Sequence, residues 1–138
     1  MNARDLAAMC FFVSSAALSA PMNPGKWELG MTVVGEGVRK YQPSVTECIS
    51  QQDIDDETRT LPRPEGACTL SSVKRTADSA SYDLACINGS LQAQGRAEIR
   101  FAGDSYDGSV IMSVSDKGAP AQLTALRITA RRVGDCAK

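Results

Sequence analysis

Histidine is absent from the 138-residue chain, and this absence excludes more chemistry than any other feature of its composition. Histidine is the commonest general base, a member of the usual catalytic triads, and a frequent ligand of zinc and haem. Without it no serine has an evident activating base, and the five cysteines contain no Cys-x-x-Cys pair of a redox centre. We therefore expect a protein that is not an enzyme and that carries no cofactor and no metal ion.

Net charge and long apolar runs are also lacking. The 15 lysines and arginines are balanced by 16 aspartates and glutamates, so the formal net charge is -1. Binding to a phosphate backbone or to an anionic membrane normally needs a basic excess. No stretch beyond Ala20 approaches the roughly 20 apolar residues that cross a bilayer. We therefore expect no nucleic-acid partner and no transmembrane segment in the mature chain.

The first residues have the order of a secretory signal peptide. A short polar start precedes an apolar run, and small residues follow as far as Ala20. This order is typical of a leader that is removed on export. Cleavage after Ser19 is favoured over cleavage after Ala20, because Pro21 would directly follow the second site. Residues 1–19 are thus predicted to be a cleaved signal peptide, and residues 20–138 a single periplasmic or secreted domain.

After Cys68 the sequence alternates apolar and polar residues in segments separated by turn residues. Such alternation is typical of antiparallel strands with one buried face. The pair Asn88-Gly89 predicts a two-residue type I′ turn that places Cys86 opposite Leu91. A three-residue loop at 76–78 places Cys68 opposite Cys86 and Ser72 opposite Tyr82.

The four cysteines that follow the leader are predicted to form two disulfides. Opposite residues of antiparallel strands lie about 4.5 to 5.5 Å apart, which is within disulfide reach. The register that sets Cys68 against Cys86 therefore predicts a cross-strand bridge. Cys48 and Cys136 then pair by elimination, and this second bridge ties the early chain to the last strand.

Two further turns continue the series of hairpins. Gly103-Asp104 places Phe101 opposite Tyr106, and a looser turn at 116–120 places Ile111 opposite Ala125. All these registers bring the apolar side chains to one face of the sheet. A slip by one residue would turn every one of them outward, so their agreement supports a common inner face.

The N-terminal part predicts the remaining elements. Alternation from Trp27 to Val33 indicates one strand, and residues 40–50 indicate a second, which Pro43 weakens. Residues 51–60 form a short helical or irregular connection whose acidic side chains are read as solvated, since they lack the spacing of a calcium loop. About seven strands result, and we predict an all-β antiparallel meander curled into a barrel-like sheet and stapled by two disulfides.

Three small residues and two arginines carry more specific expectations. Ala93, Gly95 and Ala97 follow one another on the inner face, so the sheet is expected to bend sharply there or a large side chain to cross closely. Near the chain end Arg131 points outward and Arg132 inward. An ion pair that anchors the terminus beside the last cysteine is the expected role of these arginines.

Three functions from different classes are open at this stage. The first is a binding module that encloses a small apolar or amphipathic ligand in the curled sheet, although the same side chains serve equally well as plain core. The second is a cell-envelope interaction or structural module with a filled core, which uses an outer apolar patch at Ile111, Leu123 and Ala125. The third, a hydrolase using Asp104 and Asp107, is disfavoured because both residues lie at a turn. The candidate ligand-lining residues are Trp27, Leu70, Tyr82, Leu84, Ile99, Val110, Met112 and Leu126.

Several short segments together resemble one known family. They are Pro24-Gly25-Lys26-Trp27-Glu28, Val45-Thr46-Glu47-Cys48-Ile49, Cys68 at the start of a strand, Cys86 at the end of one, Gly103-Asp104-Ser105-Tyr106-Asp107-Gly108, and Arg131-Arg132-Val133-Gly134-Asp135-Cys136. In this combination the chain is similar to the bacterial secreted family called domain of unknown function 3617. The resemblance implies an exported, four-cysteine, single-domain protein of Gram-negative bacteria, and it brings no activity and no catalytic residue.

Overall fold

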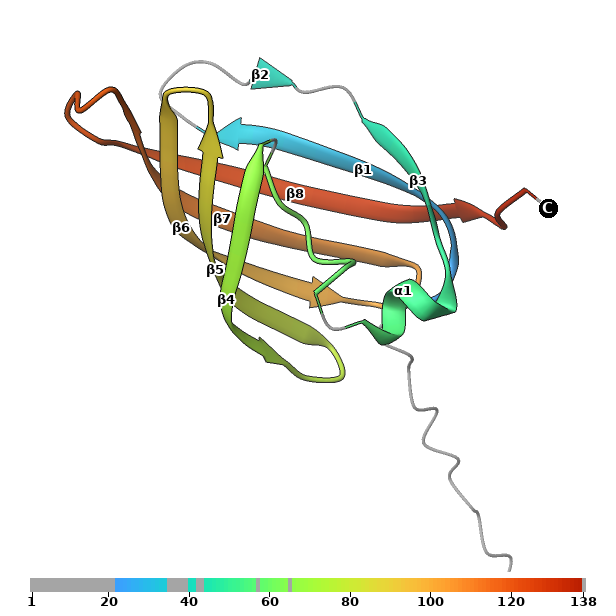
Figure 1. Cartoon of the computed structure of the whole chain (residues 1–138). Helices are drawn as coiled ribbons and strands as arrows, with labels where there is room; N and C mark the ends of the chain where they lie inside the picture. The colour runs from blue at the N-terminus through green and yellow to red at the C-terminus, as the bar shows by residue number, and fades with distance from the viewer. Residues whose placement is uncertain (1–21, 35–39, 42–43, 57, 65, 138) are drawn as a thin grey trace, which may run out of the picture.

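The computed structural model describes residues 22–34, 40–41, 44–56, 58–64 and 66–137 (Figure 1). The predicted signal peptide at 1–19 lies outside the described residues. The elements are β1 (Gly25–Val34), β2 (Lys40–Tyr41), β3 (Val45–Ile49), α1 (Gln51–Asp55), β4 (Ala67–Arg75), β5 (Ser79–Asn88), β6 (Leu91–Phe101), β7 (Ser105–Asp116) and β8 (Gln122–Gly134).

All strands belong to one antiparallel sheet in the order β2-β1-β8-β7-β6-β5-β4, and β3 also pairs with β1. β2 lies beside the end of β1 and β3 beside its beginning, so the two are successive parts of one edge. The single strand predicted over 40–50 is thus described as two separate strands, β2 and β3. The sheet curls into a half-barrel with β3 and β4 at its two open edges (Figure 1). This confirms the predicted all-β, curled fold.

Most of the predicted registers are confirmed. Cys68 lies opposite Cys86, Phe101 opposite Tyr106, and Ile111 opposite Ala125. Both predicted disulfides form, with Cα–Cα distances of 4.0 Å for Cys68–Cys86 and 5.7 Å for Cys48–Cys136. Hairpin geometry was sufficient to select one pairing of the cysteines among three.

The register predicted for the β5–β6 hairpin is wrong by two residues. Cys86 lies opposite Ala93 instead of Leu91, and Asn88 pairs with Leu91. The loop is therefore Gly89-Ser90, in which Gly89 has a φ of +61°. Only glycine adopts positive φ without steric cost, and a glycine at the first central position suits a type II′ turn. Because the shift is two residues, the same side chains still face inward.

A bulge in β4 overturns the expected pairing of Ser72 with Tyr82. The register shifts between Ser71 and Lys74, and Ser72 has a φ of +51°. The extra residue reverses the face of the sheet to which the following side chains point, so that Arg75 faces inward. Its guanidinium carbon lies 4.9 Å from the centroid of the Phe101 ring, a cation–π contact. A bulge at an edge strand also hinders pairing with another chain.

The core fills the centre of the half-barrel. Trp27, Tyr82, Ile99, Val110 and Ile128 are at most 1% exposed. One end of the concave side is covered by α1 and the segment that follows it, which Figure 1 shows crossing in front of the sheet. The covering residues Ile54, Leu61 and Pro62 are buried, and the Tyr82 hydroxyl donates a hydrogen bond of 2.5 Å to the Pro62 carbonyl.

Gly95 of β6 lies close against the neighbouring strand β7. A Cβ atom at this position would lie 2.2 Å from the Ile111 carbonyl oxygen and 2.9 Å from the Met112 Cα. Both are backbone atoms, so no change of rotamer could relieve the contact. The small residue at this position accommodates the neighbouring strand β7. The sharp bend or the crossing of a large side chain stays a prediction.

Replacing Gly95 by alanine is expected to lower the free energy of unfolding by about 2 to 3 kcal/mol, because β7 must move away. The urea midpoint of the purified domain measures the loss. Gly30→Ala is the matched control: its Cβ would meet the Thr129 Oγ1 at 3.4 Å, and we expect a change within about 0.5 kcal/mol. Equal midpoints for the two variants would show that the close approach is not a constraint.

Candidate ligand-binding site

The residues predicted to line a ligand lie together on the inner face but are tightly packed. Trp27, Tyr82, Leu84, Ile99, Val110, Met112 and Leu126 are all buried, and Leu70 is half-buried. These side chains belong to one hydrophobic cluster at the centre of the sheet. Their role as ligand-lining residues stays a prediction. Space for a small molecule has to be sought at the margin of this cluster.

A pocket of about 330 Å³ lies at that margin. We name it the mouth pocket: it lies on the concave side between β3 and residues 59–63, with Tyr106 of β7 reaching into it. Its floor is apolar and consists of Leu29, Ile49, Leu61 and Tyr106, all buried or half-buried. Sequence reasoning missed this pocket, because the segment that closes it was read as an irregular connection.

Tyr106 is held rigidly at the base of the mouth pocket. Its ring stacks on Trp27 at a centroid distance of 5.6 Å and meets the edge of Phe101 at 5.8 Å. Burial raises the pKa of the Tyr106 hydroxyl, and the negative charge of Glu47 raises it further. The phenol therefore stays protonated and neutral at all ordinary pH values.

Two ionisable groups of the mouth pocket neutralise each other. Asp53 and Arg59 form an ion pair of 2.7 Å. Asp53 also completes the capping box of α1, because it accepts a hydrogen bond of 2.9 Å from the Ser50 amide and a second from the Ser50 hydroxyl. The hydrogen bonds from Ser50 hold the pKa of Asp53 below its usual range, and Arg59 adds to this effect. The charges of Asp53 and Arg59 are thus already neutralised within the protein.

Glu47 and Arg63 are different, because no ion pair forms at either side chain within the described part of the chain. Glu47 lies directly opposite Trp27 in the β1–β3 ladder, so both side chains point to the concave side. Arg63 donates one hydrogen bond of 3.0 Å, to the Thr58 carbonyl. Thr60 also lines the pocket, and its hydroxyl oxygen is buried and has no hydrogen-bond partner among the described residues.

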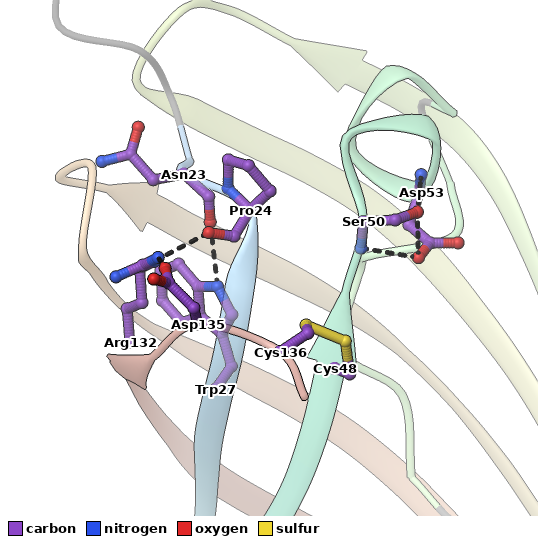
Figure 2. The surroundings of a disulfide bond; sticks show 9 residues. All are labelled: Asn23, Pro24, Trp27, Cys48, Ser50, Asp53, Arg132, Asp135 and Cys136. Carbon is purple, nitrogen blue, oxygen red and sulfur yellow. Dashed lines mark hydrogen bonds and ion pairs between the residues drawn. A yellow bond between two sulfur atoms is a disulfide. The ribbon is translucent and has the colours of Figure 1, made fainter. Parts of the chain in front are cut away.

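The chain terminus forms a second ordered corner, at the same end of the sheet (Figure 2). Arg132 donates a hydrogen bond of 2.7 Å to the Pro24 carbonyl and forms an ion pair with Asp135. The Trp27 indole donates one of 3.0 Å to the Asn23 carbonyl. The predicted ion pair beside the Cys48–Cys136 bridge is thus present. The Asn23 carbonyl of this corner holds the Trp27 indole, and Trp27 in turn stacks on Tyr106. The corner therefore also supports the floor of the mouth pocket.

An apolar patch occupies the outer face of the sheet. Ile111 is 55% exposed and Leu123 81% exposed, as the sequence predicts, and Ala125 is partly exposed between β1 and β7. Val34 extends the patch, because it pairs with Ala125 across the β1–β8 ladder and is itself 56% exposed. Sequence reasoning missed Val34, since no local pattern sets a ladder between strands so far apart in the chain.

The two aspartates considered for hydrolysis lie apart from the mouth pocket. Asp104 accepts a hydrogen bond of 2.9 Å from the Asn23 side chain, and Asp107 lies opposite Arg100 on the outer face.

In the described part of the chain, no helix has the length and apolar character needed to span a membrane.

These observations define a class of protein: a curled antiparallel half-barrel, closed at one end by a short helix and stapled by two disulfides. The chain belongs to the family described as Protein of unknown function (DUF3617), whose model matches residues 22–136. The match covers both disulfides and the terminal corner. No curated protein and no solved structure matches the chain.

Proposed function

We propose that this protein is an exported, non-catalytic binding module that takes a small amphipathic molecule into the mouth pocket. The observation that carries the proposal is the division of this pocket into an apolar floor and a charged rim. Its volume of about 330 Å³ lies at the lower end of the range typical of ligand sites. An amphipathic molecule matches both surfaces, whereas a purely apolar one would offer the rim charges no partner.

The open side of the half-barrel gives the apolar part of such a molecule a place to lie. Leu29, Met31 and Val33 alternate along β1 on the concave side, and all three are only half-buried. They lead away from the mouth pocket along β1 toward Val34. Covering them would remove further apolar surface from water, which favours binding.

Export is proposed on two grounds. The predicted leader has the order of a signal peptide. The two disulfides of the domain are of the kind that persists in oxidising compartments.

A second candidate function is an envelope interaction module. The outer patch of Val34, Ile111, Leu123 and Ala125 favours it, since exposed apolar patches often mark contact surfaces. The filled centre of the sheet is also compatible with a purely structural role.

The proposal is tested by expressing the full-length gene with its leader in a Gram-negative host and recording the native mass of the periplasmic protein. We expect an extra mass that disappears on organic extraction. Leu29→Trp should abolish it, because the larger side chain fills the mouth pocket. Leu123→Trp, on the outer face, is the matched control and should retain it.

A bare mature chain with both disulfides intact would contradict ligand carriage and favour the second candidate. An extra mass that Leu29→Trp leaves in place would show that the ligand lies elsewhere. Export fails separately if the protein remains in the cytoplasm with residues 1–19 attached.

A further inference from the structure

We propose that the mouth pocket selects a zwitterionic head group, whose cation is bound by Glu47 and whose anion is bound by Arg63. The inference rests on the proposed function, since it names the chemistry of the molecule that the pocket takes. It is carried by one charge of each sign, neither of them in an ion pair among the described residues, at a single pocket.

Glu47 supplies the cation side of the site. It lies on the open edge strand β3, points to the concave side with Trp27, and forms no ion pair among the described residues. Glu47 and Tyr106 both line the mouth pocket. A carboxylate at the pocket is a favourable partner for an ammonium group, because opposite charges attract each other.

Arg63 supplies the anion side. One of its N–H groups is occupied by the Thr58 carbonyl, and no carboxylate lies within ion-pair distance of it in the described chain. The remaining donors form the planar fork that binds a carboxylate or a phosphate through two parallel hydrogen bonds. The neighbouring Arg59 is not equivalent, because Asp53 already neutralises it.

The combination favours a zwitterion over a molecule with a single charge. A ligand that fills the pocket removes part of the water from both charges, and a charge that loses water without gaining a partner is penalised. A ligand that carries only a cation would leave the charge of Arg63 without a partner. A ligand that carries only an anion would leave the charge of Glu47 without one. Because Glu47 and Arg63 lie on an exposed rim, the preference should be moderate.

Two sources share this chemistry, and the probes distinguish them. A lysophospholipid with an ethanolamine head carries an ammonium, a phosphate and an acyl chain that can lie along Leu29, Met31 and Val33. Free leucine carries an ammonium, a carboxylate and a short apolar side chain. Tighter binding of the lysophospholipid would identify a lipid head group, and tighter binding of leucine an amino acid.

The test is isothermal titration of the mature, disulfide-bonded protein with monomeric probes. The zwitterionic probes are lysophosphatidylethanolamine and leucine. Lysophosphatidic acid and isocaproate are the matched probes that lack the cation. A long-chain alkylamine and isoamylamine are the matched probes that lack the anion. A monoacylglycerol is the neutral probe. We expect a zwitterion to bind about tenfold more tightly than its singly charged analogues, the size of one charge-assisted contact.

Charge-removing variants assign each half of the head group. Glu47→Gln should abolish the preference of the protein for the zwitterion over the anionic probe. Arg63→Gln should abolish its preference for the zwitterion over the cationic probe. Glu28→Gln and Arg131→Gln are the matched controls, because these residues form an ion pair of 3.5 Å on the outer face. Both should leave all affinities unchanged.

The outcomes separate this inference from the proposed function. Equal affinity for the zwitterionic and neutral probes, unaffected by Glu47→Gln and Arg63→Gln but lost in Leu29→Trp, would overturn the zwitterion and leave an apolar binding site. No binding of any probe, together with a bare native mass, would overturn both proposals.

Discussion

Replacing Cys48 and Cys136 together by serine is expected to lower the free energy of unfolding by about 4 to 5 kcal/mol, the largest effect of any change considered. The bridge joins residues separated by 88 positions, so it restricts a long loop of the unfolded chain. It also holds the terminal corner in which Arg132 reaches the Pro24 carbonyl. Urea unfolding of the double variant, monitored by circular dichroism without reductant, measures the loss.

The second bridge provides the control. Cys68 and Cys86 are separated by 18 positions, and loop-closure entropy predicts a smaller loss of about 3 kcal/mol for the double serine variant. The order of the two effects is therefore the diagnostic result. If the Cys68–Cys86 variant were the less stable one, local packing in the β4–β5 hairpin would outweigh the entropy of the unfolded chain.

Trp27→Ala is the second change with a large expected effect, a loss of about 3 to 5 kcal/mol. Trp27 is 1% exposed, stacks on Tyr106 and donates a hydrogen bond to the Asn23 carbonyl. Its removal leaves a cavity in the core and an unsupported ring at the base of the mouth pocket. Because Trp27 is the only tryptophan, unfolding has to be followed by circular dichroism and not by indole fluorescence.

Two further variants separate the causes of this loss. Trp27→Phe keeps an aromatic ring but removes the indole donor, and we expect it to recover a large part of the stability. Leu123→Ala removes an apolar side chain that is 81% exposed and should change the stability by less than about 0.5 kcal/mol. A loss for Trp27→Ala no greater than that for Leu123→Ala would contradict the assignment of Trp27 to the core.

Both stability predictions bear on the candidate site. The Cys48–Cys136 bridge anchors β3, which carries Glu47, and Trp27 supports Tyr106. A variant that loses either support is expected to lose the shape of the mouth pocket before the whole domain unfolds. Binding experiments should therefore use rim substitutions such as Glu47→Gln, which leave the bridge and the aromatic stack in place.

The sequence by itself determined the strands, their inner face and the pairing of the cysteines. These features depend on local information: apolar residues alternate with a period of two, and a short turn sets the register of the hairpin that it joins. The Cys68–Cys86 bridge followed because both residues lie in one hairpin. The β5–β6 register was missed by two residues, since a shift of two keeps every side chain on its predicted face.

Only the tertiary structure decided the rest. The bulge at Ser72 interrupts the alternation of apolar and polar residues along β4, and no local pattern predicts it. The bulge alone turns Arg75 toward Phe101. The mouth pocket requires β3, the segment at 59–63 and Tyr106 to meet, and no local pattern relates segments so distant in the chain. Whether an inner apolar residue is core or lining likewise depends on how tightly the sheet curls, which is set by packing between strands and not by the order of residues within one.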